Sequence, residues 1–188
     1  MERIETFHSP LGEDALWFRR LRLNEQLSQP FMDEIALLSR EANLQANALL
    51  GQTVTVRLDT HAPRPRFFVN ARVARFAQIG RDGRYYVYQA ELQPWFWFLQ
   101  RTTDCQNLSG PEIVRQIFAE HPIAQFIERL ATSYPKHNYC VQYNESDFAF
   151  VSRLLEQEGI SYGFEHQNGQ HKMVLGDGIG AHLGGCYG

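Results

Sequence analysis

The feature that most constrains the fold is a long stretch of period-two alternation interrupted by an Asp-Gly pair. Apolar side chains recur at every second position before Asp82-Gly83 and again after it, up to Pro94. Asp and Gly tolerate positive φ in tight hairpin turns, and Pro94 cannot donate to a strand ladder. The pattern predicts a long antiparallel hairpin that turns at Asp82-Gly83. Its alternating positions are Phe67, Val69, Ala71 and Val73 on one strand and Tyr86, Tyr88, Ala90 and Leu92 on the other.

Upstream of this hairpin the sequence predicts three further strands and one helical turn. Leu21 and Leu23 alternate with polar residues, which is the period of a strand. Gly51 is placed as the C-terminal stop of the helical turn. The first hundred residues are therefore expected to be mostly β-structure. The remaining predicted segments are a strand over 31–38 after Pro30, the helical turn over 43–50 and a strand over 54–58.

From about residue 100 the pattern shifts toward helices. Ser109-Gly110-Pro111-Glu112 is a capping box with proline in the first turn, and it predicts a helix that ends at His121-Pro122. A second helix is predicted over 146–158, where Gly159 ends it. Its expected buried residues are Phe148, Val151, Leu154 and Leu155. Strands are expected around 126–130, 139–143 and 160–164, followed by a tight turn at Asn168-Gly169 that leads to Met173 and Leu175.

These segments predict an α+β fold dominated by antiparallel sheet. We expect a strand-rich domain over residues 1–100 and an α/β segment over 101–178. The residues 179–188 are glycine-rich and are expected to be a tail or linker. The sequence shows no internal repeat.

Charge and hydropathy argue against nucleic-acid and membrane partners. The chain has 18 basic and 21 acidic residues and a formal net charge of -3, which gives no bulk attraction to phosphate. The longest apolar run, Trp95 to Leu99, is far too short for a membrane span. The first residues contain no apolar stretch of the kind found in a signal peptide. We therefore expect synthesis in the cytoplasm, with any export requiring a dedicated machine.

The cysteines suggest neither a disulfide framework nor a nucleophile. Cys105, Cys140 and Cys186 are an odd number without a CxxC pair, which indicates a reducing compartment during folding. Cys140 lies next to Val141 in a predicted strand, so its interpretation as a small hydrophobic core residue is simpler than its interpretation as a catalytic thiol. No cofactor is predicted.

Two other kinds of chemical site were considered, a zinc site and a pair of carboxylates for acid–base catalysis. His166, His171, His182 and Cys186 offer four zinc ligands, but their spacing matches no known finger, and the two histidines beside the Asn168-Gly169 turn are expected to be exposed. The carboxylate pairs Glu145/Asp147 and Glu156/Glu158 could act as acid and base. Capping of a helix N-terminus and a solvated helix face explain them more simply. We therefore predict no catalytic and no metal-binding residue.

One segment suggests a binding surface instead of a chemical site, namely the run Trp95, Phe96, Trp97, Phe98 and Leu99. Five consecutive large apolar residues cannot all face one core from a single amphipathic element. Either the segment is buried on all sides, or it contributes anchors to a contact between chains, where aromatic residues are enriched. These five residues are our candidate oligomer interface.

Three segments in register resemble the opening part of the Vgr family of Rhs-associated proteins, the VgrG-type spikes of type VI secretion. The first is Leu27-Ser28-Gln29-Pro30-Phe31 followed by Leu49-Leu50-Gly51-Gln52. The second contains Gly80-Arg81-Asp82-Gly83-Arg84, Tyr88 and the run from Ala90 to Leu99. The third runs from Tyr139 to Phe148 and continues through Phe150 to Glu156, Glu158-Gly159-Ile160 and Phe164-Glu165-His166.

The resemblance covers residues 4–178 and implies a structural rather than an enzymatic function. It implies a β-barrel hub domain like that of contractile phage tails. Expected partners are further copies of the chain in a homotrimer, Hcp-like tube hexamers and baseplate proteins. It also implies export through the type VI apparatus. Because the sequence stops at Gly188, we expect the OB-fold and needle of the family to be absent from it.

Two alternatives remain open. The same fold serves as a phage or prophage tail hub of the late-control type. A cysteine- or metal-dependent hydrolase is the other alternative, and an activity lost with one Cys or His would distinguish it.

Overall fold

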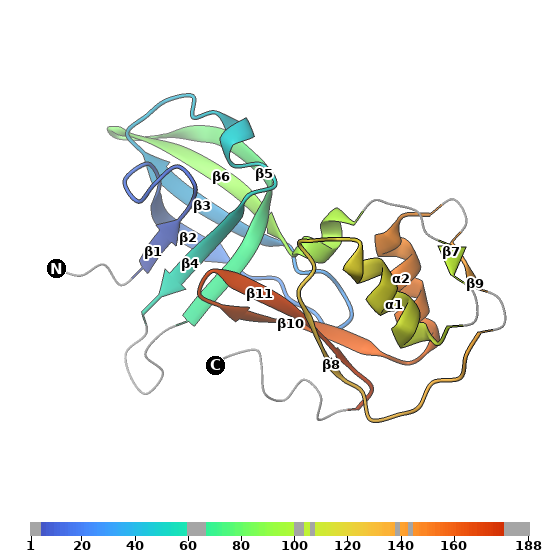
Figure 1. Cartoon of the computed structure of the whole chain (residues 1–188). Coiled ribbons are helices and arrows are strands. Elements are labelled where there is room, and N and C mark those ends of the chain that lie inside the picture. The colour runs from blue at the N-terminus through green and yellow to red at the C-terminus, as the bar shows by residue number, and fades with distance from the viewer. Residues whose placement is uncertain are drawn as a thin grey trace.

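The computed structural model describes residues 5–59, 67–99, 104–105, 108–137, 140–142 and 145–178. Strands predominate in the first part and two α-helices occupy the second (Figure 1). In chain order the elements are β1 (Glu5–His8), β2 (Trp17–Arg22), β3 (Asp33–Ser39), η1 (Ala46–Ala48), β4 (Thr53–Leu58), β5 (Phe67–Asp82), β6 (Tyr85–Gln93), η2 (Trp95–Phe98), β7 (Asp104–Cys105), α1 (Gly110–Ala119), β8 (Phe126–Arg129), β9 (Cys140–Val141), α2 (Asp147–Gln157), β10 (Ser161–Gln167) and β11 (Gln170–Gly176).

The first six strands form one antiparallel sheet that curls into a nearly closed barrel. Their order is β1-β4-β5-β6-β3-β2, so β1 and β2 are the two edges of the sheet. These edges lie near each other without a ladder between them. The register of β5 against β6 shifts between Val73 and Arg75 and again between Gln78 and Gly80. Such irregularities bend a strand and increase its twist, which allows the 16-residue β5 to wrap around the barrel.

The predicted hairpin is confirmed, with its turn one residue later than expected. Asp82 is the last residue of β5 and pairs with Tyr85, so Gly83 and Arg84 occupy the turn. Gly83 has φ +57°, a conformation that glycine adopts without steric cost. The β6 strand ends at Gln93, directly before Pro94, as predicted.

Alternating side chains of the barrel strands form its interior. The period-two residues Val69, Ala71 and Val73 of β5 are at most 1% exposed. On β3 the buried positions include Asp33 and Ser39 as well as Ile35 and Leu37. Asp33 and Ser39 therefore place a carboxyl group and a hydroxyl group on the same alternation as the buried apolar residues of β3.

The second part pairs two helices with a three-stranded sheet of order β10-β11-β8. β10 and β11 are an antiparallel hairpin, and β8 adds to β11 in parallel. The capping box of α1 is present, because Ser109 N–H and Oγ lie 2.8 and 2.9 Å from Glu112 Oε2. The predicted helix over 146–158 is confirmed as α2, where Ser146 Oγ accepts a hydrogen bond from Ala149 N–H.

The buried face of α2 differs from the prediction at one position. Val151, Leu154 and Leu155 are buried as expected, but Phe150 is the fully buried aromatic residue and Phe148 is half-buried. Phe148 lies at the first turn, where its ring packs 5.0 Å from that of Phe96. It covers the edge of the core and does not enter it.

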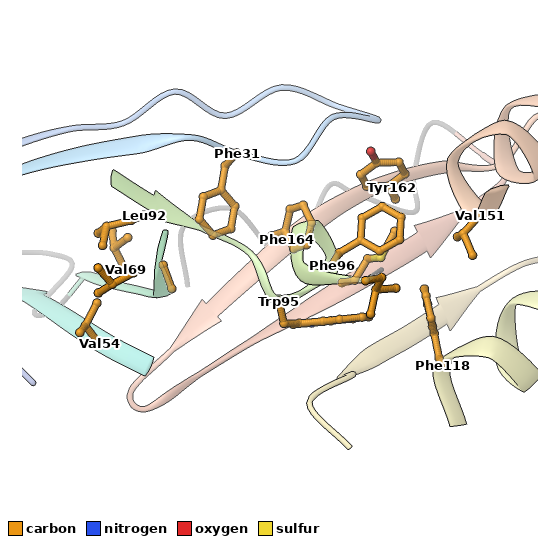
Figure 2. Packing of buried hydrophobic residues seen from close by; sticks show 14 of the residues in the cluster. Phe31, Val54, Val69, Leu92, Trp95, Phe96, Phe118, Val151, Tyr162 and Phe164 are labelled. Carbon is orange, nitrogen blue, oxygen red and sulfur yellow. The ribbon is translucent and has the colours of Figure 1, made fainter. Parts of the chain in front are cut away.

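One continuous hydrophobic cluster connects the barrel to the helices (Figure 2). Val54, Val69 and Leu92 lie at its barrel end, and Phe118 and Val151 lie at its helical end. No helix in the described ranges is long and apolar enough to cross a membrane.

Candidate functional site

The aromatic segment η2 divides into a buried and an accessible half. Trp95, Phe96 and Leu99 are at most 1% exposed, whereas Trp97 is 41% exposed and Phe98 is half-buried. The ring of Phe96 is surrounded by aromatic rings, with centroid distances of 5.0 to 6.0 Å to Phe118, Phe148, Tyr162 and Trp95. Within this chain, therefore, Trp97 and Phe98 are the two members of the predicted interface that offer accessible surface.

A hydrogen-bond network fixes the backbone of η2 to the β10–β11 hairpin and to the barrel. Trp95 N–H donates to His171 Nε2 at 2.9 Å, and His171 Nδ1 lies 2.9 Å from Asn70 Oδ1. Asn70 Nδ2 in turn donates to Val54 O and Thr55 Oγ1 of β4. Burial, together with nearby His166 and Arg72, lowers the pKa of His171 to about 3. A neutral imidazole with its proton on Nδ1 satisfies both contacts.

A second group of titratable residues lies beside this network. Asp33 is fully buried, and its Oδ1 accepts a hydrogen bond from Asn24 N–H at 2.8 Å. Its Oδ2 has no hydrogen-bond partner among the described residues. The pKa of Asp33 is raised to about 6, mainly because burial disfavours the charged carboxylate. The hydrogen bond from Asn24 opposes this increase, Glu25 adds to it, and His166 opposes it. His166 Nε2 lies 3.4 Å from Glu25 Oε1.

We call Asn70, His171, His166, Asp33 and Glu25 the seam cluster. Its members come from β5, β11, β10, β3 and the β2–β3 loop, so it lies where the barrel meets the second sheet. Phe31 packs within it, 5.0 Å from the ring of His166 and 5.8 Å from that of His171. The expectation that both histidines are exposed beside their turn is wrong, because packing against the barrel buries them.

The proposed zinc ligands do not come together in the described part of the chain. His171 uses both ring nitrogens in contacts with the protein, and His182 and Cys186 lie outside the described residues. Within the described ranges, no group of three or more His, Cys, Asp or Glu residues is arranged to hold a metal ion.

The carboxylates have structural partners. Asp147 is fully buried at the start of α2, with Oδ2 2.7 Å from His121 Nε2 and Oδ1 accepting from Gln142 Nε2. Glu158 Oε1 lies 2.6 Å from His137 Nε2, and Glu145 pairs with Arg153. Glu156 is exposed, as predicted. Asp147 therefore joins α2 to the end of α1, a role that helix-end patterning does not reveal.

Cys140 is a free, half-buried thiol on β9 and packs at the margin of the core. In the β7–β9 pair it lies directly opposite Cys105. This backbone pairing could not be predicted from sequence patterns, because the two cysteines belong to separate short strands. Cys186 lies outside the described residues.

Comparison with known families identifies the fold. The profile described as phage tail baseplate hub (GPD) matches residues 24–185. The chain belongs to the phage tail baseplate hub family. This match includes β3 to β11 and every member of the seam cluster.

Within the hub family, the chain is similar to secretion spike proteins. It is 40% identical over 183 residues to the type VI secretion system spike protein VgrG1b of Pseudomonas aeruginosa, and 41% identical over 185 residues to VgrG1a of the same organism. These alignments cover 96% and 97% of this chain but 25% and 29% of the relatives. The resemblance to VgrG-type proteins is confirmed, and the chain spans about a quarter of their length.

Solved hub structures share the fold. The Escherichia coli c3393 protein, a type VI secretion component similar to the T4 tail proteins gp27 and gp5, aligns with a TM-score of 0.73 at 23% identity, covering 86% of this chain and 50% of that one. A tail protein of Neisseria meningitidis aligns with a TM-score of 0.59 at 10% identity, covering 92% and 49%. The mainly antiparallel, barrel-like architecture is therefore that of a tail hub.

Proposed function

We propose that this chain is the hub portion of a type VI secretion spike, which assembles with two further copies of itself and docks onto the Hcp-like tube and baseplate. The observation that carries the proposal is the 40% identity to a secretion spike protein across 96% of the chain. A hub of this kind presents fixed surfaces, and the continuous core holds the barrel and helices in one arrangement. The proposal includes synthesis in the cytoplasm and export by the secretion apparatus.

The exposed part of η2 is the proposed contact with a neighbouring copy. Trp97 and Phe98 stand on a backbone that His171 and the buried rings of Trp95 and Phe96 hold in place. Their rings pack edge to face with centroids 5.2 Å apart. A preorganised aromatic pair loses little side-chain entropy when it is covered, which suits an interface anchor.

Measurements of self-association test the proposed contact at η2. Trp97→Ala should weaken self-association in sedimentation equilibrium by about tenfold or more, because a buried Trp anchor contributes strongly to binding. Ile79→Ala is the matched control, since Ile79 is 57% exposed and lies near the opposite end of the β5–β6 hairpin. Equal effects of the two substitutions would argue against an interface at η2.

The alternative is that the chain is a tail hub of a phage or prophage. The family profile supports this alternative, as does the fold that the chain shares with a prophage tail protein. Co-sedimentation with purified tube proteins separates the two functions. Binding to hexamers of the secretion tube but not to a phage tube protein supports the spike function. The opposite preference would assign the chain to a tail.

We also propose that the chain has no turnover chemistry, since its family consists of structural spike and hub proteins. Replacing each cysteine by serine should leave tube binding unchanged apart from a modest loss of stability. A hydrolytic activity that disappears with one of these substitutions would contradict the proposal.

A further inference from the structure

The turn between β5 and β6 lies at the end of the barrel that points away from the two helices (Figure 1). The strand pairing brings the end of β5, the start of β6, the end of β3 and the start of β2 together there. Arginines and aromatic residues gather at this end. We call Trp17, Arg19, Arg40, Arg84 and Tyr85 the arginine–aromatic surface; its three arginines are exposed and its two rings are half-buried.

We propose that the arginine–aromatic surface binds an acidic segment of another protein, whose Asp or Glu carboxylates are held by the guanidinium groups of Arg40 and Arg84. The surface lies at the opposite end of β6 from η2, so it is separate from the proposed contact at Trp97 and Phe98. The inference does not depend on the proposed spike function.

The two aromatic rings hold the guanidinium groups in place. Trp17 and Tyr85 pack edge to face with ring centroids 5.6 Å apart. The Cζ atom of Arg40 lies 5.3 Å from the ring centroid of Trp17, and that of Arg84 lies 5.0 Å from the ring centroid of Tyr85. A guanidinium group that contacts the face of a ring can still donate N–H groups to both oxygens of a carboxylate. Because the rings restrict both arginines beforehand, binding costs less side-chain entropy.

The charges of Arg40 and Arg84 are left without a carboxylate partner in the part of the chain that the structure describes. Arg19 pairs with Asp82 at 2.9 Å, but no described carboxylate lies within ion-pair distance of the other two arginines. Interaction with Arg84 lowers the pKa of Tyr85, desolvation opposes this shift, and Arg40 adds to it. Both guanidinium groups therefore lie close to one phenol oxygen. An anion bound between them would offset the repulsion of the two like charges.

The residue types and the limited extent of the surface favour a protein partner over a nucleic acid or a membrane. Arg, Trp and Tyr are the residue types most enriched among the residues that dominate protein–protein binding energy. Binding to a phosphate backbone instead relies on many basic contacts along an extended track. This chain has a formal net charge of -3, and Glu13, Asp14 and Glu41 lie close in sequence to Trp17 and Arg40.

Isothermal titration calorimetry of the full chain with an octaglutamate peptide, blocked at both ends, tests the proposal. We expect saturable binding that weakens as the salt concentration rises, since the attraction is between exposed charges. An octaglutamine peptide has the same length without the charge and should not bind. Arg40→Gln and Arg84→Gln should each weaken octaglutamate binding about tenfold, because each removes charge-assisted hydrogen bonds.

Three further variants separate the surface from net charge alone. Arg75→Gln is the matched control, because it removes the same charge from an arginine that is 74% exposed and pairs with Glu91. It should change the affinity by less than about twofold. Tyr85→Phe keeps the ring and should bind as the original chain does. Tyr85→Ala removes the ring beneath Arg84 and should weaken binding. Circular dichroism of each variant checks that the fold is retained.

Several results would overturn the proposal. One is the absence of saturable octaglutamate binding at low salt, and another is an equal loss of affinity in Arg75→Gln and Arg84→Gln. A DNA duplex and phosphatidylserine vesicles are the remaining probes. If either bound more tightly than octaglutamate and lost that binding in Arg40→Gln and Arg84→Gln, the surface would recognise phosphate groups and not an acidic protein segment.

Discussion

Among single residues, Asp33 and His171 have opposite effects on stability at acidic pH. The raised pKa of Asp33, about 6 in the fold, means that the folded chain holds a proton between about pH 4 and 6 that the unfolded chain has released. This contribution to stability therefore falls as the pH rises through that window. The lowered pKa of His171, about 3, means that the unfolded chain binds the extra proton below about pH 6.5. That contribution is lost as the pH falls, so the two changes oppose each other between pH 4 and 6.

Removing the Asp33 carboxylate should expose the effect of His171. We expect Asp33→Asn to increase the free energy of unfolding at pH 7 by roughly 1–3 kcal/mol, because no charge is then buried. Between pH 6 and 4 the variant should lose stability more steeply than the original chain. Urea denaturation at intervals across this range measures both effects.

Glu34→Gln is the control for this experiment. Glu34 adjoins Asp33 on β3, but its side chain is 41% exposed, and its Oε2 lies 3.9 Å from a guanidinium nitrogen of Arg22. The shape of the stability profile should therefore stay as it is in the original chain. If the plot of unfolding free energy against pH for Asp33→Asn ran parallel to that of the original chain, the seam cluster would not be the cause of the pH dependence.

At the scale of elements, the β5–β6 hairpin depends on one backbone conformation. Gly83 has φ +57°, and a Cβ placed there would meet no atom within 4 Å. Gly83→Ala should therefore cost about 1 kcal/mol through backbone strain alone. Gly80 has equally open surroundings without positive φ, so Gly80→Ala should change the unfolding free energy by less than about 0.5 kcal/mol. Similar losses at both sites in thermal melts would show that the turn is not the cause.

The α2 helix gives a second contrast between adjacent residues. Leu155 is 1% exposed and Glu156 is exposed. Leu155→Ala should cost about 2–5 kcal/mol because burial is lost and a cavity is left. Glu156→Ala should cost less than about 0.5 kcal/mol. Chemical denaturation of both variants measures the difference in unfolding free energy. Equal losses would show that the face of α2 containing Leu155 is not the one packed against the core.

The elements themselves were largely predictable from the sequence, for a physical reason. Turn chemistry at Gly83, the capping box at Ser109 and the apolar period of α2 are local, so a short window contains the information. The exchange of Phe148 for Phe150 as the buried ring was not predictable, because the choice depends on where η2 presents Phe96.

At the scale of the whole molecule, the division at residue 100 stays a prediction, and cooperativity tests it. The seam cluster and the shared hydrophobic core join the two parts. We expect one unfolding transition, with far-UV circular dichroism and tryptophan fluorescence giving the same midpoint in urea. Two separate transitions would show that residues 1–100 and 101–178 are independent units.

The seam cluster was the part of the molecule that sequence patterns could not reveal. Asn70 and His171 are separated by 101 positions. Outside the cluster, Tyr162 N–H donates to Ser28 Oγ across 134 positions. Only the packing of the hairpin on the barrel brings them together, so His171 resembled a turn residue and Asp33 a polar residue at a strand end. The same distance effect hid the pairing of Cys105 with Cys140.

The position of the β10–β11 hairpin also sets an order of events in time. All six barrel strands are translated before Pro94, but the amides of Ser28 and Trp95 donate to Tyr162 O and His171 Nε2, which are translated much later. Water must solvate these two amides in any early barrel intermediate, and contacts so distant along the chain form slowly. In pulsed hydrogen exchange during refolding, we expect Val69 and Tyr88 to gain protection before Ser28 and Trp95 do. Simultaneous protection of all four would mean that the barrel waits for the last hairpin before it forms.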